Sequence, residues 1–256
     1  MDNLSKEYLV NSLNKGKRED GRKFDEIRKV QIENDVSNNA EGSARVKLGE
    51  TEVIVGIKME MGTPYPDNPD EGTIIVSAEM LPLSSPDFES GPPSEDSIEL
   101  ARVVDRAIRE SGALDLKKLC VEEGEKVWLV LIDIYTINDG GNLQDAATLA
   151  ALAALKDAKI PGFDGEKVDY KKKKGSLPLS ELPVECTSIR IKDKILSDAS
   201  IDEYKHLDAR LTIATLENGD ICAMQKGGEG TLTAEDIKEM VKASLKNGKI
   251  LRKELK

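Results

Sequence analysis

Apolar and polar residues alternate between residues 30 and 81, which is typical of β-strands with one buried face. The alternation predicts strands over residues 30–32, 44–48, 53–61 and 73–80. The Gly49-Glu50 step between the second and third strands is short enough for a hairpin, whereas the connection from Pro64 to Gly72 is longer and looser. We therefore expect these strands to form an antiparallel meander.

Three other segments repeat apolar residues at the spacing of amphipathic helices. The first, before the Lys15-Gly16 break, carries Leu4, Tyr8, Leu9 and Leu13. The second is expected to begin after Ser94, a favoured N-cap residue, and to end at Gly112. The last should open with a capping box from Thr233 to Asp236 and bury a stripe made of Ile237, Met240, Val241, Leu245 and Leu251.

The middle of the chain holds its most apolar segments. Residues 127–137 form a nearly continuous apolar run, which predicts a central strand buried on both faces. A turn over residues 139–142 leads into residues 146–155, a predicted helix that is apolar around its whole circumference. We expect this helix to lie inside the domain.

A turn-rich stretch separates this part from a second, smaller unit. Residues 161–184 include the basic run from Lys171 to Lys174 and are predicted to be a linker or long loop. Beyond it, strands are expected at residues 186–191, 194–196, 207–216 and 220–225, the last two joined by the Asn218-Gly219 hairpin signal.

Composition narrows the possible functions. With 256 residues the chain suits one large or two modest domains, and its formal charge of −11 argues against an autonomous nucleic-acid binder. The three cysteines lie far apart and His206 is the only histidine, so we expect neither a zinc site nor a multi-histidine metal site, and no cofactor. The polar N-terminus and the lack of an 18-residue apolar run predict a cytoplasmic protein.

Residues 18–30 alternate opposite charges densely before the first strand. Such a run is often only a solvated segment, but this one resembles the opening signature of the RNase PH family, the phosphorolytic 3′ to 5′ exoribonucleases. The likeness extends from about residue 16 to residue 251. It implies an α/β (α+β) RNase PH-like fold, with a core like domain 2 of ribosomal protein S5 and a smaller C-terminal α/β subdomain. The implied units are an N-terminal helix and lead-in over 1–26, the core domain over 27–160, a linker over 161–184 and the C-terminal domain over 185–256.

Within that family the chain looks most like the non-catalytic subunit of the archaeal exosome ring. The likeness rests on the phrases at residues 99–106, 139–142 and 207–212. It implies a catalytic RNase PH-like partner, three such heterodimers in a hexameric ring, RNA-binding cap subunits, and RNA itself. A generic α/β binding module without a homologous partner is a further possibility that the pattern leaves open.

The start of the buried helix departs from the pattern of active relatives. Those relatives place Gly, Ser or Thr, and Arg there to hold inorganic phosphate, whereas this chain has Asn142, Leu143 and Gln144. Leucine cannot donate a hydrogen bond, glutamine carries no charge, and Asp145 in the first turn repels an anion. We interpret Asn142 as a helix cap and Asp145 as a partner of the helix dipole.

A second departure concerns two aspartates that active relatives use for metal-assisted or acid catalysis. The best alignment places Tyr204 and Arg210 there, and neither can bind Mg²⁺ or protonate a leaving oxygen at neutral pH. We therefore predict a non-enzyme without catalytic or metal-binding residues. The alternative is a phosphorolytic 3′ to 5′ exoribonuclease in its own right, in which a shift of the alignment by two residues makes Asp208 catalytic.

Arg102, Arg106 and Arg109 fall within an arc of about 60° on the helix expected after Ser94, opposite its apolar face. Acidic residues three or four positions away on the same helix can simply pair with them. The resemblance favours another role, because subunits of this type lend arginines from the matching helix to the RNA backbone beside the neighbour's active site. We therefore predict that all three bind RNA. The Lys171 to Lys174 run is a second cationic candidate, but such runs are more often solvated loops.

Overall fold

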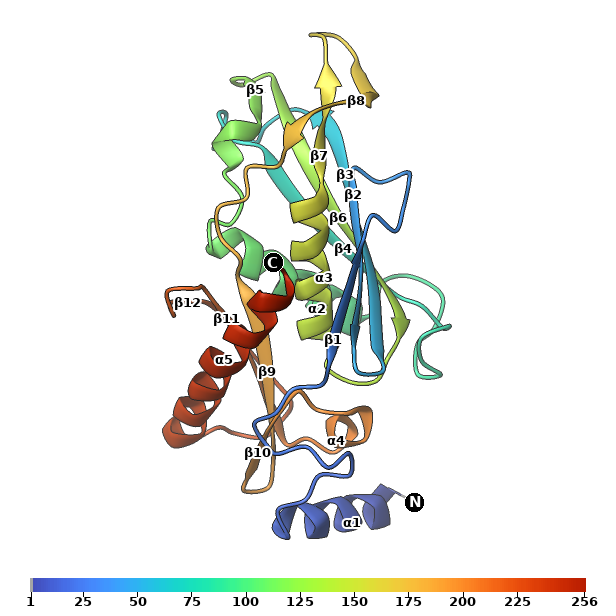
Figure 1. Cartoon of the computed structure of the whole chain (residues 1–256), viewed down its shortest axis with the longest axis vertical. Helices are drawn as coiled ribbons and strands as arrows, with labels where there is room; N and C mark the ends of the chain where they lie inside the picture. Colours follow the sequence, from blue (N-terminus) through green and yellow to red (C-terminus); the bar gives the residue numbers. More distant parts are fainter. Residues whose placement is uncertain (1) are drawn as a thin grey trace.

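The alternating strands assemble into a six-stranded sheet in the computed structural model, which describes residues 2–256 (Figure 1). Its path runs through β1 (Val30–Asn34), β2 (Gly42–Leu48), β3 (Thr51–Gly62), β6 (Lys126–Asn138) and β4 (Thr73–Met80), with the short β5 (Cys120–Glu122) paired to β6. The α/β fold class predicted from the sequence is confirmed.

The predicted antiparallel meander included one strand too many, because β4 is not part of it. Strands β1, β2 and β3 do form it, but β4 lies on the far side of β6 and pairs with it in parallel. The cause is the connection between them, which contains α2 (Glu95–Glu110) and the 3₁₀ helix η1 (Leu116–Leu119) and so allows a crossover instead of a hairpin.

Helices α2 and α3 (Leu143–Asp157) cover one face of this sheet. Helix α3 is buried from Leu143 to Leu155, as its uniform apolarity predicted, and it packs against β2 and β3. The contact is close at Gly42, where an added Cβ would lie 2.4 Å from the Cα of Ala158. The expectation that β6 is buried on both faces is wrong: residues on the helix side are buried, but Tyr135 on the opposite face is 37% exposed.

The segment predicted to be a linker or long loop contains a β-hairpin instead. Strands β7 (Lys159–Phe163) and β8 (Val168–Ser176) pair with each other and project from one end of the molecule (Figure 1). The basic run from Lys171 to Lys174 lies exposed on β8. Residues 169–176 are almost all polar and exposed, so no apolar face marked this strand in the sequence.

The smaller unit is a four-stranded sheet flanked by helices. Its strands run in the order β10 (Lys194–Ser197), β9 (Val184–Ile191), β11 (Ala209–Thr215) and β12 (Ile221–Gly227). Helix α5 (Ala234–Glu254) packs on β9 and β11, and its predicted capping box between Thr233 and Asp236 is present. The short α4 (Ile201–Lys205) precedes β11. Within residues 2–256, no helix is both long and apolar enough to cross a membrane.

The N-terminal helix α1 (Asp2–Asn14) belongs to this smaller unit. Leu9 and Leu13 are buried against Ile189 and Leu196 of its sheet, whereas Tyr8 remains exposed. Half of the apolar positions read from the sequence therefore face the fold, because a single helix on the sheet surface can bury only one narrow stripe.

Candidate functional site

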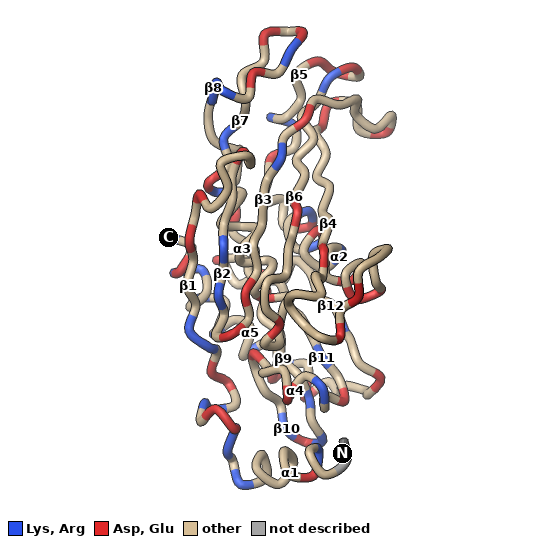
Figure 2. The backbone as a smooth tube through the Cα atoms, turned by 90° about the vertical axis from the view of Figure 1, so that its right-hand side faces the viewer, with Lys and Arg blue, Asp and Glu red and all other residues tan. Residues whose placement is uncertain are grey.

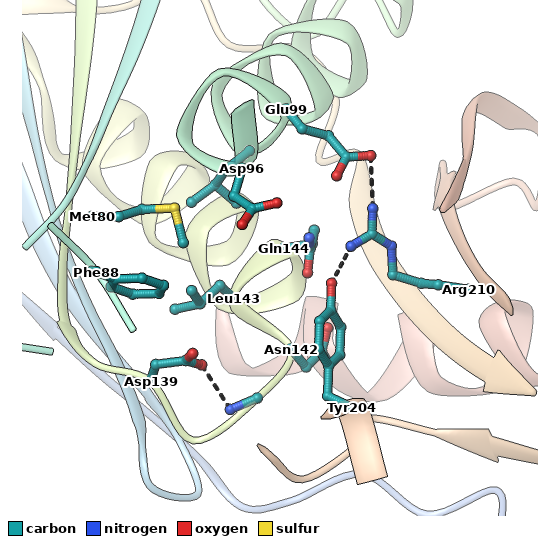
Figure 3. Close-up of a pocket in the computed structure, with 12 residues that line it drawn as sticks. Met80, Phe88, Asp96, Glu99, Asp139, Asn142, Leu143, Gln144, Tyr204 and Arg210 are labelled. Carbon is teal, nitrogen blue, oxygen red and sulfur yellow. Dashed lines mark hydrogen bonds and ion pairs between the residues drawn. The ribbon is translucent and has the colours of Figure 1, made fainter. Parts of the chain in front are cut away.

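A pocket of about 100 Å³ lies at the N-terminal end of α3, between α2, α4 and β11 (Figure 3). Residues from distant parts of the sequence line it: Met80, Phe88, Asp96, Glu99, Leu100, Asp139, Gly141, Asn142, Leu143, Gln144, Tyr204 and Arg210. The fold thus brings the Asn142-Leu143-Gln144 triplet together with Tyr204 and Arg210. The two places where the sequence departs from the pattern of active relatives therefore line the same pocket.

The first turn of α3 is built differently from the helix cap that we predicted. Asn142 occupies the N-cap position in a left-handed conformation (φ 59°, ψ 50°), but its side chain does not cap the helix. Its Nδ2 instead donates to Asp145 Oδ2 and to Asp198 Oδ1, both at 2.8 Å. Asp145 in turn accepts hydrogen bonds from the backbone N–H and the hydroxyl of Thr187 in β9. Asp145 serves as a buried link to β9, and burial raises its pKa to about 7.

This pocket is poorly equipped to hold orthophosphate. Leu143 brings no donor, and the Gln144 side chain is neutral and only 7% exposed. Its Oε1 has no hydrogen-bond partner among the described residues. Acidic side chains also line the pocket, namely those of Asp96, Glu99 and Asp139. An anion entering the pocket would meet these carboxylates and find no free cationic group.

Arg210 is the one basic residue among those that line the pocket, all of which the structure describes, and its guanidinium is already engaged. Its Nη2 donates to Glu99 Oε1 at 2.7 Å, and its Nη1 contacts the hydroxyl of Tyr204 (Figure 3). The guanidinium also lies over the Tyr204 ring. Burial alone would lower the pKa of Arg210, but Tyr204 and Glu99 outweigh that effect and raise it. Arg210 therefore stays charged and paired, unlike a catalytic carboxylate.

Asp208, the residue that the enzymatic alternative would make catalytic, does not line the pocket. Its Oδ2 accepts a 2.6 Å hydrogen bond from the backbone N–H of Lys192, and its Oδ1 lies 3.5 Å from Lys6 Nζ. Burial alone would raise the pKa of Asp208, but these two contacts outweigh it and lower the pKa. The carboxylate stabilises the turn between β9 and β10 and ties α1 to it.

A buried ion network supports the floor of the pocket. Asp198 is fully buried and accepts hydrogen bonds from Arg28 at 2.7 Å and from Arg22 at 3.0 Å. Arg28 also donates to the backbone carbonyls of Gly140 and Gly141, at 2.8 and 2.9 Å. The charged run of residues 18–30 is therefore not a solvated segment, because it fastens the loop before α3 to the smaller unit.

Arg18, at the start of the same run, makes a second buried link. Its Nε and Nη2 donate to the two carboxylate oxygens of Glu203 at 2.8 and 2.6 Å, and its Nη1 donates to the carbonyl of Ser197. The sequence showed that paired charges were available here but not that their partners lie about 175 to 185 residues further along.

Several residues that line the pocket could not be recognised as site residues from the sequence. Met80 ends β4, Phe88 follows it in a loop, and Asp96 lies in the first turn of α2. Each has an ordinary structural explanation when it is considered alone, and only the tertiary fold places them together. In the part of the chain that the structure describes, no three His, Cys, Asp or Glu side chains are grouped so that they could hold a metal ion.

The three arginines of α2 lie outside this pocket and differ in their contacts. Over residues 2–256, the exposed Arg102 makes no hydrogen bond or ion pair. Arg106 Nη1 donates to Gln225 Oε1 at 3.0 Å, and Arg109 pairs with Asp105 at 2.6 Å. Simple pairing along the helix therefore accounts for Arg109 but not for Arg102.

The sequence matches two family descriptions that between them cover most of the chain. Residues 26–161 match the "3' exoribonuclease family, domain 1", and residues 181–247 match domain 2 of the same family. Among curated proteins, "Exosome complex component Rrp42" of Methanocella arvoryzae is 49% identical over 98% of this chain and 95% of its own length. The protein of the same name from Archaeoglobus fulgidus is 50% identical over 99% of this chain and 96% of its own length.

Solved structures agree with the sequence comparisons. A chain of the Archaeoglobus fulgidus exosome with RNA bound to the active site superposes with a TM-score of 0.93 at 49% identity, covering 99% of this chain and 98% of that one. A chain of an archaeal exosome core superposes with a TM-score of 0.88 at 46% identity, covering 99% and 96%. Rice Rrp46, with a TM-score of 0.70 at 18% identity over 93% and 97%, shares the fold.

Proposed function

This chain belongs to the RNase PH family of 3′ exoribonucleases, and we propose that it acts as a non-catalytic subunit of an exosome, a complex that degrades RNA by phosphorolysis. In this proposal it pairs with a catalytic RNase PH-like homologue, helps to shape that partner's active site, and guides RNA toward it. Three such heterodimers close a hexameric ring in the cytoplasm, on which RNA-binding cap subunits sit. The chain supplies residues 27–160 and 185–256 as its two RNase PH-like domains.

The observation that carries the proposal is the state of the pocket at the start of α3. Phosphorolysis needs an orthophosphate held beside the scissile bond, together with a group that assists proton transfer or charge stabilisation. Here Leu143 and Gln144 offer no cation, Arg210 is paired with Glu99, and Asp139 adds a negative charge. The first requirement is therefore not met by this chain's own residues, and Tyr204 and Arg210 stand where active relatives carry the two aspartates that serve the second.

Arg102, Arg106 and Arg109 are the residues that we propose to contact RNA. Figure 2 shows Lys and Arg interspersed with Asp and Glu along the whole molecule, so a local group of arginines must supply the attraction. Arg102 is exposed and unengaged within residues 2–256, and Arg106 has only a neutral partner in Gln225. Both can turn to a phosphate without breaking an ion pair, whereas Arg109 must first release Asp105.

The test uses a complex co-expressed with the catalytic RNase PH-like subunit of an archaeal exosome. Native mass spectrometry should give the mass of three heterodimers, and the complex should bind a fluorescent poly(A) strand. Three arginines that neutralise three phosphates of a single strand contribute about −2 to the slope of log K against log salt. Replacing Arg102 and Arg106 with alanine should therefore weaken binding at low salt and flatten that slope.

A matched control removes the same charge elsewhere. Lys238 and Lys249 are exposed on α5, and their double alanine variant loses two positive charges as well. It should leave the affinity for poly(A) close to that of the unmodified complex. Equal losses in both double variants would mean that only net charge matters, and the role proposed for the α2 arginines would then fail.

A further inference from the structure

Glu99 of α2 pairs with the sheet of the smaller unit instead of with an arginine on its own helix. Its Oε1 accepts a hydrogen bond from Arg210 Nη2 of β11 at 2.7 Å (Figure 3), and a second one from Gln225 Nε2 of β12 at 3.2 Å. Arg102 lies three positions further along α2, where opposite charges commonly pair. Within residues 2–256, however, Arg102 makes no ion pair. The contacts from the smaller unit therefore draw Glu99 away from Arg102.

The other acidic neighbour of Arg102 is engaged as well. Asp105 lies three positions after Arg102 and pairs with Arg109 at 2.6 Å. The residues four positions away are Ile98 and Arg106, and neither is acidic. Other arginines thus hold both carboxylates that could neutralise Arg102 along the helix. This leaves the Arg102 side chain exposed and unpaired within the part of the chain that the structure describes.

Gln225 holds Arg106 without neutralising it. Its Oε1 accepts a hydrogen bond from Arg106 Nη1 at 3.0 Å, while its Nε2 donates to Glu99. The reverse orientation of the amide would place its oxygen against the Glu99 carboxylate and its NH₂ group against the guanidinium. Glu99 therefore fixes the direction in which the amide points. Because the amide is neutral, Arg106 keeps its full charge for a phosphate.

Arg210 is confined to the position from which it reaches Glu99. The residue is 5% exposed, and its guanidinium contacts the hydroxyl of Tyr204. Gly227, which lies opposite Arg210 on β12, leaves room for the guanidinium, since an added Cβ there would lie 2.6 Å from Arg210 Nη2. The packing around Arg210 thus directs its Nη2 toward the Glu99 carboxylate.

We propose that Arg210 and Gln225 are positioning residues for RNA binding: together they hold Glu99, and so keep Arg102 and Arg106 available for the phosphates of a strand. The inference rests on the proposed function, in which these arginines contact RNA. Without Arg210, Glu99 is an ionised carboxylate that can turn to Arg102 and compete with phosphate. Arg210, which stands where active relatives carry a catalytic aspartate, thus supports RNA binding instead of chemistry.

The experiment measures binding of fluorescent poly(A) at several salt concentrations by complexes co-expressed with the catalytic partner. Arg210→Met should weaken binding about fivefold at low salt, the effect of a unit charge ~4 Å away in water. It should also reduce the steepness of the salt dependence by about 0.7, because one phosphate contact is lost. Lys238→Met, which removes the same charge from an exposed position on α5, should keep the affinity of the unmodified complex.

Combining Arg210→Met with Glu99→Gln separates positioning from a merely structural role. The second change removes the released carboxylate, so the double variant should regain the affinity of the unmodified complex, whereas structural damage from the loss of Arg210 would persist. If Arg210→Met does not assemble, Gln225→Glu on the edge strand β12 provides the second comparison. Its new carboxylate should pair with Arg106 and weaken poly(A) binding by a similar factor.

Unchanged affinity in Arg210→Met would overturn the inference, as would the lack of any recovery in the double variant or, where Gln225→Glu is used, full affinity in that variant. The alanine replacements of Arg102 and Arg106 distinguish this failure from failure of the proposed function. If they leave poly(A) binding unchanged, the proposed RNA contacts are wrong. If they weaken binding and Arg210→Met does not, only the positioning role is wrong.

Discussion

Glu185 offers the sharpest test of how burial in this protein changes the protonation of a carboxyl group. The side chain lies on β9, is only 1% exposed, and accepts a 2.5 Å hydrogen bond from the Thr148 hydroxyl. Burial raises the pKa of Glu185 to about 8, the charge of Asp145 acts in the same direction, and Thr148, Arg210 and Arg106 only partly oppose this. The folded protein therefore keeps Glu185 protonated at neutral pH.

Replacing Glu185 with glutamine mimics that protonated form and keeps an acceptor oxygen for Thr148. In the unfolded chain the glutamate releases its proton near its ordinary pKa of 4.5, whereas the folded chain retains it up to about pH 8. The unfolded state thus binds fewer protons in this window, so Glu185 makes stability fall as pH rises, by up to ~1.4 kcal/mol per pH unit. Between pH 5 and pH 7.5 the advantage of the glutamine variant should grow by about 3 kcal/mol.

The assay is urea unfolding of both proteins at pH 5 and pH 7.5. Glu239→Gln, at an exposed position on α5, is the matched control and should show no growing advantage. Asp145, whose pKa burial raises to about 7, makes stability fall with pH in all three proteins and largely cancels in the differences. A constant difference between Glu185→Gln and the unmodified protein across this pH range would refute the reasoning.

Three further substitutions test packing and local structure by urea unfolding. Asp198→Asn should destabilise the protein by about 3–5 kcal/mol because it leaves Arg28 without its buried counter-charge. Burial alone would raise the pKa of Asp198, but Arg28 outweighs burial and lowers the pKa. The stabilisation from this ion pair should therefore also disappear as pH falls through the acidic range. Gly42→Ala should cost about 1–3 kcal/mol, since the added Cβ overlaps the backbone at Ala158, and no loss would show that α3 can shift away. Ser94→Ala should cost about 1 kcal/mol because the Ser94 hydroxyl accepts from the Ser97 backbone N–H, and an unchanged midpoint would mean that water replaces the cap.

Local features of the fold could be predicted from the sequence because they depend on neighbouring residues. The caps at Ser94 and Thr233 are where the composition of the first helical turn places them, and the uniform apolarity of residues 146–155 identified the central helix. The parallel pairing of β4 with β6 could not be predicted, because strand order depends on how a long connection crosses the sheet. The β7–β8 hairpin was missed because β8 is mostly polar and exposed, and because β7 contains Pro161 and Gly162, residue types that are typical of turns.

In the candidate site, too, only part could be predicted from the sequence. Leu143, Gln144, Tyr204 and Arg210 could be picked out because a family pattern predicts other chemistry at these positions. The pairing of Glu99 with Arg210, instead of with an arginine on its own helix, depends on the packing of α2 beside β11. No sequence spacing contains that information, since the two residues are 111 positions apart.

The central claim is that this chain contributes scaffold and RNA contacts but no chemistry. The most direct measurement is phosphate-dependent release of nucleoside diphosphates from poly(A) RNA by the assembled complex, after the catalytic aspartate of the partner subunit has been replaced by asparagine. The account predicts no release above the background without phosphate, while the complex with an intact partner remains active. Sustained phosphate-dependent release by the partner-inactivated complex would contradict the account, because the turnover would then have to come from this chain.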